Sequence, residues 1–546
     1  MKIALAQLNY HIGNFEANTK KIIDAVSAAK SQGADLVVFA ELAICGYPPR
    51  DFLEFTEFIE LCEASAKEIA KSCIDIACII GLPTVNSNIS GKDLNNSAYF
   101  IANGELKAVV NKTLLPTYDV FDEYRYFEPN TSFNCIEFKG VKIALTICED
   151  LWNINDNPLY VSNPMDVLIR QKPDLMINIA ASPFDYKHDE DRLKVLSDNS
   201  RKYNLPLMYV NQVGSQTEII FDGGSLVFNE QGELLDELEY FKESIGIYEF
   251  ESGKIVGRTP IKHNGVSDIE MIHDALVLGI RDYFKKSGFK EAVLGLSGGI
   301  DSALVCALAS QALGPQNITG VLMPSKFSSD HSVQDAVDLA KNLGCKHQII
   351  AIKEATDAYD NMLKPVFKDL PFNVAEENIQ ARARAIVVMA FSNKFGSILL
   401  NTSNKSECAV GYGTLYGDMA GAISVLGDVY KTQVYDLCNF INRDAEVIPQ
   451  NTITKPPSAE LRPGQKDSDS LPDYDILDRI LFQYIELKKS SRNIIEQGFS
   501  EVLVRKVIAM VNKAEFKRYQ TPPILRVSPK AFGMGRRMPI VGKYLS

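Results

Sequence analysis

Three residues in the first half of the chain, Glu41, Lys112 and Cys148, have the side chains needed to break an amide bond. A thiolate can attack the amide carbonyl, a carboxylate can take the thiol proton and pass it to the leaving ammonia, and a cation can stabilise the oxyanion. A nearby lysine is also expected to lower the pKa of the thiol. Each residue alone also fits a structural role, since a cysteine on an apolar strand is usually a core thiol. Together they predict a site that releases ammonia.

A second candidate site is a glycine-containing run between an apolar strand and an apolar helix. It consists of Gly295, Leu296, Ser297, Gly298, Gly299, Ile300, Asp301 and Ser302. Two adjacent glycines let the backbone approach an anion, and the amides at the helix start point toward it. Because Asp301 would repel a phosphate, we interpret it as a ligand for Mg²⁺. The Walker A pattern GxxxxGK[ST] is absent, so the run predicts a phosphate site of another kind.

The elements around the first site are short buried strands that alternate with helices. Glu41 follows the predicted strand Asp35–Phe39, and Cys148 directly follows Lys142–Ile147. Side chains at the ends of strands can converge in one crevice of an α/β fold. Further strands are expected at Lys2–Leu8, Ile76–Gly81, Leu175–Ala180 and Leu207–Asn211, with hairpin turns at Asn103-Gly104 and Gln231-Gly232. This pattern predicts two sheets sandwiched between helices.

Composition changes midway along the chain and predicts two domains. Residues 1–250 form the first domain, residues 251–268 form a linker rich in Gly, Pro and polar residues, and residues 269–546 form the second. A helix is expected at Ile269–Lys286, and strands at Ile318–Leu322, Gln348–Ile352 and Ser397–Asn401. Strand, glycine loop and helix open a doubly wound parallel sheet that binds nucleotides.

The bulk properties exclude several classes of protein. A formal charge of −12 argues against nucleic-acid and membrane-surface binding, because both need a basic face. There is no signal-peptide core and no long apolar stretch without charges, so we expect no membrane span. Ten cysteines without a CxxC pair indicate reduced thiols and a cytoplasmic enzyme, and the scattered histidines disfavour a zinc site.

The first half resembles the nitrilase, or carbon–nitrogen hydrolase, superfamily. The resemblance rests on the segments FAELAICGYPP, NKTLLPTYDVFDEYRYFEP and LTICEDLW, which contain Glu41, Lys112 and Cys148. It implies a nitrilase-like α-β-β-α sandwich in which these three residues are catalytic. Glu123 would orient the triad, or it is a surface acid beside Arg125.

The same resemblance implies a glutamine pocket. Tyr118 and Ser182 would hold the substrate, and a lysine further along would help them. Lys187 is assigned to that role, although it lies one place short of the family spacing and His188 occupies the spacing itself.

The second half resembles the ATP-pyrophosphatase family, and within it the NAD synthetases. The carrying segments are GLSGGIDSA, TSNKSE, GYGTLYGDMAG, PPSAELRPGQKDSDSLP and KRYQTPP, in the family order. The resemblance implies that Glu407 joins Asp301 at the metal, that Thr402 and Ser458 contact ATP, and that Lys431 lies on its phosphates.

The synthetase resemblance also implies a site for deamido-NAD formed by Asn378, Glu407, Asp418 and Lys517. Where ammonia-dependent enzymes carry a lysine, this chain has Leu415, so a basic contact must come from another residue. The family's deamido-NAD site lies at a subunit interface, which implies a homo-oligomer.

Taken together, the two halves resemble glutamine-dependent NAD(+) synthetases. The implied reaction adenylates deamido-NAD with ATP and amidates it with ammonia from L-glutamine, with Mg²⁺ at the phosphates. Two alternatives remain. Thiouridylases, GMP synthetases and argininosuccinate synthetases share the ATP loop, although the segments after it disfavour them. A stand-alone amidase with a nucleotide-sensing second half would bind ATP without releasing pyrophosphate.

Overall fold

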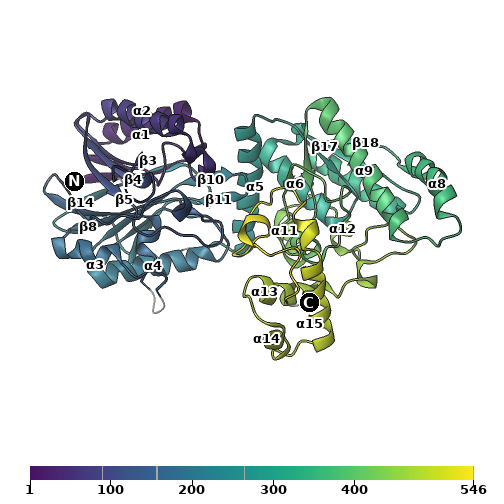
Figure 1. The fold of residues 1–546 in the computed structure, drawn as a ribbon. Coiled ribbons are helices and arrows are strands. Elements are labelled where there is room, and N and C mark those ends of the chain that lie inside the picture. The colour runs from purple at the N-terminus through teal and green to yellow at the C-terminus, as the bar shows by residue number, and fades with distance from the viewer. Residues whose placement is uncertain (89, 155–157, 264, 545–546) are drawn as a thin grey trace. The chain divides into compact units, whose positions relative to one another are not determined.

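Two β-sheets face each other in the N-terminal unit, Met1–Gly265, with helices over each outer face (Figure 1). The computed structural model describes residues 1–88, 90–154, 158–263 and 265–544. Helices α1 (Phe15–Ser31) and α2 (Thr56–Ser72) cover the first sheet, and α3 (Pro164–Leu168) and α4 (His188–Tyr203) cover the second. The predicted α-β-β-α sandwich is therefore confirmed.

The strands of the first sheet follow the order β15-β14-β1-β2-β3-β4-β5, and those of the second the order β13-β12-β9-β8-β7-β6. The first sheet contains β1 (Lys2–Gln7), β2 (Leu36–Val38), β3 (Ala77–Val85), β4 (Leu94–Ala102), β5 (Glu105–Asn111), β14 (Ser244–Glu251) and β15 (Lys254–Val256). The second contains β6 (Ile136–Phe138), β7 (Val141–Ile147), β8 (Leu175–Ala180), β9 (Leu207–Asn211), β12 (Leu226–Phe228) and β13 (Leu234–Glu237). A separate hairpin joins β10 (Val213–Gln216) to β11 (Ile219–Asp222).

The core of this unit lies between the two sheets. Ile3, Val38 and Ile79 of the first sheet pack with Leu145 and Ile177 of the second, and all five are buried. Helices bury the opposite faces as well, so the central strands are apolar on both sides, as their sequences predict. The sandwich thus forms a rigid support for residues at the strand ends.

The segment between the two units is shorter than the sequence predicts. Its expected start, residue 251, belongs to β14, and the next residues turn into β15, which pairs with β14. The helix that follows, α5 (Asp268–Ser287), already begins at the expected last linker residue. A three-residue strand with one buried side chain has too weak a pattern to be seen in a polar sequence.

A parallel sheet forms the centre of the C-terminal unit, Val266–Ser546, with the strand order β18-β17-β16-β19-β20. The bounds are β16 (Ala292–Gly295), β17 (Ile318–Leu322), β18 (Lys346–Ile349), β19 (Ile398–Asn401) and β20 (Ile423–Ser424). The chain proceeds outward from β16 in one direction and returns to β19 on the other side. This confirms the doubly wound fold and places a topological switch point between β16 and β19.

Helices surround this sheet and build a smaller layer beyond it (Figure 1). They are α5, α6 (Ile300–Leu313), α7 (Asp330–Leu343), α8 (Lys353–Phe367), α9 (Val374–Phe395), α10 (Lys405–Val410), α11 (Lys431–Ile441), α12 (Gln450–Thr454), α13 (Tyr474–Ile485), α14 (Ser491–Ile495), α15 (Glu501–Lys513) and α16 (Glu515–Arg518). A separate apolar cluster includes Leu477, Ile480 and Val507 and joins α13 to α15. Across the described residues, the helices lack the length and apolar character needed to cross a bilayer.

Candidate active sites

Glu41 and Lys112 form a buried ion pair at strand ends of the first sheet. Glu41 lies shortly after β2, and Lys112 directly follows β5. Lys112 Nζ lies 2.7 Å from Glu41 Oε1 and 2.8 Å from the carboxylate of Glu123, and all three side chains are buried. Buried charges persist only when they are paired and hydrogen-bonded. The structure therefore brings two of the predicted residues together with a second acid.

Glu123 is a buried member of this group and not a surface acid. It begins the 3₁₀ turn Glu123–Arg125, and Tyr47 donates its hydroxyl proton to Glu123 Oε1 at 2.8 Å. Burial raises the pKa of Glu123 to about 7, although Lys112 acts to lower it. Its contact with Lys112 fits an orienting role.

Two further donors hold the Glu41 carboxylate. Asn96 Nδ2 on β4 donates to Oε1 at 2.7 Å, and the backbone N–H of Ala181, just after β8, donates to Oε2 at 3.0 Å. One donor comes from each sheet, so the carboxylate is held in one orientation across the sandwich. A general base that takes the proton of one thiol must be held in a fixed position, and these donors hold Glu41 in this way.

Cys148 follows β7 and begins the 3₁₀ turn Cys148–Leu151 with a left-handed φ of 44°. Non-glycine residues seldom adopt this conformation, which recurs at functional sites. The thiol is buried and interacts electrostatically with Glu41, Lys112 and Glu123. Lys112 acts to lower the pKa of Cys148, as expected, but burial and Glu41 outweigh it and raise the pKa well above its usual value.

Glu149, next to the thiol in sequence, is a buried acid that the sequence analysis missed. Tyr118 donates its hydroxyl to the Glu149 carboxylate at 3.0 Å, and Tyr160 does the same at 3.0 Å. Burial raises the pKa of Glu149 to about 7. Tyr118 is exposed, so its hydroxyl links the buried acid to the surface of the unit.

Ser182 contacts His188, the residue after Lys187. Ser182 Oγ lies 3.0 Å from His188 Nε2, and the imidazole stacks on Trp152 at 4.9 Å between ring centroids. Lys187 is exposed, and its Nζ lies over the ring of Tyr186. The predicted contact of Lys187 with glutamine stays a prediction, and His188, the first residue of α4, is the second candidate for that position.

The predicted phosphate loop joins β16 to α6 at the switch point of the parallel sheet. Gly298 has φ 82°, and a Cβ there would lie 2.1 Å from the carbonyl oxygen of Ser332, so the loop requires glycine. The hydroxyls of Ser297 and Ser302 lie 3.1 Å apart, and the backbone N–H of Gly299 donates to Ser297 Oγ. Hydroxyls and helix-start amides thus line a loop suited to an anion.

Asp301 lies in a cluster of charges with the other residues predicted at the metal and the phosphates. It forms an ion pair with Lys431, and Asn404 Nδ2 donates to it at 2.9 Å. Asn404 also caps α10 through the backbone N–H of Glu407 at 3.0 Å. Burial and the nearby charge of Asp301 raise the pKa of Glu407 well above its usual value. The site therefore concentrates negative charge around one lysine.

Asp467 is a further acid of this cluster that the sequence analysis did not identify. Tyr474 donates its hydroxyl to Asp467 at 3.0 Å, and Tyr412 does so at 3.3 Å. Burial raises the pKa of Asp467, and its charge in turn raises that of Glu407. A cavity of about 650 Å³ opens beside Asp467 and Tyr474. Asp467 is far from Asp301 in the sequence, so no motif links the two acids.

The residues predicted to face deamido-NAD gather around the loop 411–418. Thr414 donates its hydroxyl to Asn378 Oδ1 and its backbone N–H to Asp418 Oδ1, both at 2.6 Å. Lys517 Nζ donates to two carbonyl oxygens of the same loop at 2.7 and 2.8 Å. The charge of Lys517 acts to lower the pKa of Asp418, although burial raises it overall. These predicted residues therefore share one loop.

Three remaining positions complete the predicted set. Arg382 Nε donates to the carbonyl oxygen of Leu415 at 3.2 Å, so a basic side chain does reach this position from α9. Thr402 follows β19, the strand beside β16, at the switch point. Ser458 donates its hydroxyl to the carbonyl oxygen of Gln465 at 2.6 Å, within its own loop.

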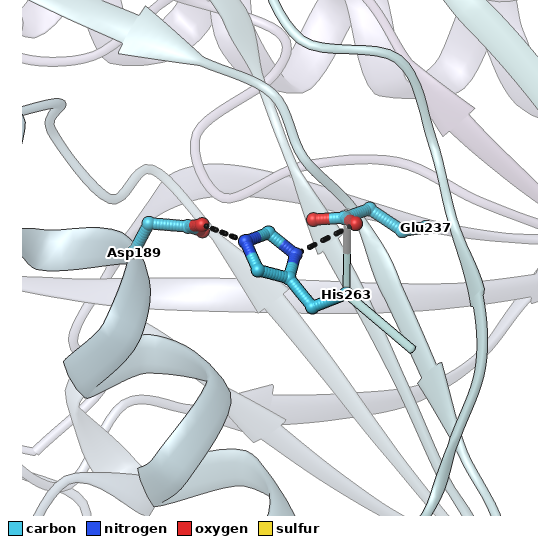
Figure 2. A group of neighbouring side chains, drawn as sticks. All are labelled: Asp189, Glu237 and His263. Atoms are coloured by element: carbon cyan, nitrogen blue, oxygen red, sulfur yellow. Dashed lines mark hydrogen bonds and ion pairs between the residues drawn. The ribbon is translucent and has the colours of Figure 1, made fainter. Parts of the chain in front are cut away.

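Among the described residues, one group with metal-ligand side chains lies elsewhere, at Asp189, Glu237 and His263 (Figure 2). The imidazole sits between the carboxylates, with Nε2 3.1 Å from Asp189 and Nδ1 2.9 Å from Glu237. The ring thus fills the space between the acids, and Arg192 forms an ion pair with Asp189 at 2.8 Å. We interpret the group as a structural contact that joins the end of the N-terminal unit to α4 and β13.

Two family models match the chain, carbon-nitrogen hydrolase over residues 2–256 and NAD synthase over residues 272–521. A glutamine-dependent NAD(+) synthetase of Synechocystis sp. is 47% identical over 547 residues, covering 98% of this chain and 98% of the relative. The relative of that description from Acinetobacter baylyi is 41% identical over 542 residues, covering 99% of this chain and 98% of the relative.

Two solved structures have the same architecture. A glutamine-dependent NAD+ synthetase from Acinetobacter baumannii, in complex with adenosine diphosphate, is 38% identical with a TM-score of 0.79, covering 100% of this chain and 99% of that chain. The glutamine-dependent NAD(+) synthetase from Cytophaga hutchinsonii has a TM-score of 0.82 at 23% identity, covering 100% of this chain and 98% of that chain, and shows the fold alone. From the full-length relatives and both site geometries, the chain belongs to the family of glutamine-dependent NAD(+) synthetases.

Proposed function

We propose that the two sites of this chain act in sequence, the first releasing ammonia from L-glutamine and the second attaching it to deamido-NAD with ATP. The observation that carries the proposal is the presence, in one chain, of the Glu41–Lys112 pair beside Cys148 and of the phosphate loop beside Asp301. The products are NAD, AMP, pyrophosphate and glutamate. Joint formation of these products from deamido-NAD, ATP and glutamine tests it. Pyrophosphate release with another carboxylate acceptor, but not with deamido-NAD, would contradict the proposal.

Ammonia release begins with proton transfer from the Cys148 thiol to Glu41. Because burial holds the pKa of the thiol high, the proton must leave as the sulfur attacks the glutamine carbonyl. Lys112 stabilises the oxyanion, and its 2.7 Å contact with Glu41 supports this position. Glu41 then gives the proton to the departing ammonia, and water hydrolyses the thioester to glutamate.

Glutamine is held by its charged end groups. The Glu149 carboxylate, beside the nucleophile and in contact with Tyr118, suits the α-ammonium group. Ser182 and His188, which lie 3.0 Å apart, suit the α-carboxylate. In this arrangement Tyr118 covers the entrance.

The glutamine KM is expected to rise as the pH falls through about 7. The pKa of Glu149 is raised by burial to about 7, so the group is ionised above this pH and neutral below it. Protonation removes the partner of the α-ammonium group, and each pH unit below 7 is expected to raise KM by up to about tenfold. Glu123 also titrates near 7, but it contacts Lys112 and is expected to affect kcat.

Steady-state glutaminase kinetics between pH 6 and 8.5 provide the measurement. Glu149→Gln, which is neutral throughout, is the matched variant and should show a high KM that does not vary with pH. A variant whose KM still falls as the pH rises would rule out Glu149 as the titrating group.

His188→Ala is expected to raise the glutamine KM about tenfold, the effect of losing about 1.4 kcal/mol of binding free energy. The substitution removes the partner of Ser182 and the ring that stacks on Trp152. Lys187→Ala is the neighbouring control and should leave KM unchanged, because this side chain is exposed. Equal effects of the two substitutions would contradict the assignment.

In the second site, the nicotinate carboxylate attacks the α-phosphorus of ATP and pyrophosphate departs. Ammonia then attacks the mixed anhydride, and AMP leaves. The hydroxyls of Ser297 and Ser302 and the amides at the start of α6 suit the phosphates, and Lys431 stands ready to neutralise the departing charge. Thr402, at the adjacent strand end, and Ser458 are the further proposed contacts to ATP. Activation is required because a carboxylate does not react with ammonia at neutral pH.

The carboxylates of the second site fit a magnesium ion. Asp301, Glu407 and Asp467 offer oxygen ligands, and the pKa of Glu407 is raised partly because the other two acids lie close by. We assign Asp301 and Glu407 as its ligands. When bound, the ion would offset negative charge on the phosphate oxygens. The role of Lys431 is compatible with this, since it already balances part of the same charge.

Deamido-NAD is proposed to bind along the loop 411–418, where Asn378, Asp418 and Lys517 meet. Glu407 lies one turn before this loop and links it to the phosphate site. Arg382, beside Leu415, supplies the basic contact that replaces the missing lysine.

We infer a homo-oligomer, and the exposed apolar side chains of α8 and α9 support this inference. Met362 and Val366 of α8 are exposed, as are Val374, Ile386 and Phe395 of α9. A concentration of exposed apolar side chains marks an interaction surface. Asn378 lies on the same α9, so a second copy would pack beside the deamido-NAD site.

We place the enzyme in the cytoplasm. Its proposed partners are its small-molecule substrates. All ten cysteines are free thiols, which suits a reducing compartment. The formal charge of −12 disfavours nucleic acid and membrane surfaces as partners.

A further inference from the structure

Asp150 joins two segments of the N-terminal unit through three backbone hydrogen bonds. Its Oδ1 accepts the N–H groups of Thr113 and Leu114 at 3.0 and 2.8 Å, and its Oδ2 accepts that of Ile147 at 3.1 Å. The side chain is 2% exposed. A buried carboxylate that accepts three N–H groups is well satisfied, so its position and that of its donors are strongly coupled.

The donors flank the two residues that must meet for catalysis. Thr113 and Leu114 directly follow Lys112 at the end of β5 in the first sheet, whereas Ile147 directly precedes Cys148 at the end of β7 in the second sheet. The ammonium group of Lys112 itself bonds to the acids Glu41 and Glu123. Asp150 therefore connects the segment that carries Lys112 to the segment that carries Cys148.

We propose that Asp150 is a positioning residue that fixes Lys112 relative to the Cys148 nucleophile. It touches neither substrate nor thiol, and it acts by holding the backbone on which each residue is mounted. A misplacement of about 1 Å in such a constellation costs on the order of 10²-fold in rate. The inference rests on the proposed role of Cys148 as the nucleophile.

Positioning and direct electrostatics predict opposite shifts of the thiol pKa. Loss of a negative charge near the thiol would by itself stabilise the thiolate and lower the pKa of Cys148. Loss of the anchor lets Lys112 move away, and since Lys112 acts to lower this pKa, the pKa rises. Asp150 is not among the main charges acting on the thiol, so the second effect should dominate.

The test is Asp150→Asn, which keeps the shape but leaves one N–H without an acceptor. We expect a fall in glutamine-driven kcat on the order of 10²-fold, a change in glutamine KM of less than about threefold, and full ammonia-driven synthesis. The rate of Cys148 alkylation by iodoacetamide, followed by peptide mass spectrometry, should reach half-maximum at a higher pH than in the unsubstituted protein. Asp174→Asn is the matched control, because Asp174 accepts the N–H of Lys142 at the other end of β7.

An alkylation profile that is unchanged or shifted to lower pH would overturn the positioning role. Asp150→Glu keeps the charge but lengthens the side chain. It should show the same upward shift, so it carries the test if the asparagine variant does not fold. A different result would contradict the proposed function itself: glutaminase activity that persists in Cys148→Ala.

Discussion

Cys148→Ala is expected to abolish NAD synthesis from glutamine while synthesis from ammonium salts continues. Removal of the nucleophile should lower glutamine-driven kcat on the order of 10³-fold or more, because the remaining groups cannot form the thioester. The second site has its own phosphate loop and acids, formed by the other unit of the chain. The second site can therefore use ammonia from solution when the first site is inactive.

The measurement is the rate of NAD formation with each nitrogen donor, at pH 8.5 for the ammonium salt so that more of it is the neutral nucleophile. Cys135→Ala is the matched control, since Cys135 is a half-buried free thiol of the same unit away from the triad. It should leave both rates unchanged. Full glutamine-driven activity of Cys148→Ala would remove the thiol from the mechanism.

Asp301→Ala is expected to stop NAD synthesis with either nitrogen donor, by on the order of 10² to 10³-fold. The substitution removes a carboxylate proposed to hold the metal and leaves Lys431, its buried partner, without an ion pair. Glutaminase activity at the first site should remain measurable. The contrast with Cys148→Ala follows from the position of each residue in a different unit.

Pyrophosphate release and NAD formation are measured together for this variant, with circular dichroism to verify folding. Asp338→Asn, on the outer part of α7 in a surface pair with Lys341, is the control and should behave like the unsubstituted chain. Loss of glutamine-driven synthesis alone would show that Asp301 does not serve the adenylation step.

Strand patterns and short motifs were enough to predict the sandwich, the doubly wound sheet and the convergence of Glu41 with Lys112. Buried strands read as apolar runs, and their ends necessarily meet at one edge of an α/β layer. The glycine loop was equally accessible, because Gly298 is required by the close approach of the Ser332 carbonyl.

Some site residues lie in turns, where the sequence pattern does not show which way a side chain points. Glu149 and Asp467 both lie in short 3₁₀ turns, so neither shows whether it faces inward until the chain is folded. The choice between Lys187 and His188 depends on where α4 begins, which the sequence does not show. Lys112 acts to lower the pKa of Cys148, as expected, but the net pKa is raised by burial and Glu41, and a sequence gives no magnitudes for such opposing effects.

Transfer of the amide nitrogen of glutamine into NAD tests the central claim most directly. The chain is supplied with deamido-NAD, ATP and glutamine labelled with ¹⁵N at the amide, and the products are followed by mass spectrometry. We expect ¹⁵N in the carboxamide of NAD, with one glutamate, one AMP and one pyrophosphate for each NAD when the two sites are fully coupled. Glutamate release with no ¹⁵N in NAD, or pyrophosphate release that does not depend on deamido-NAD, would contradict it.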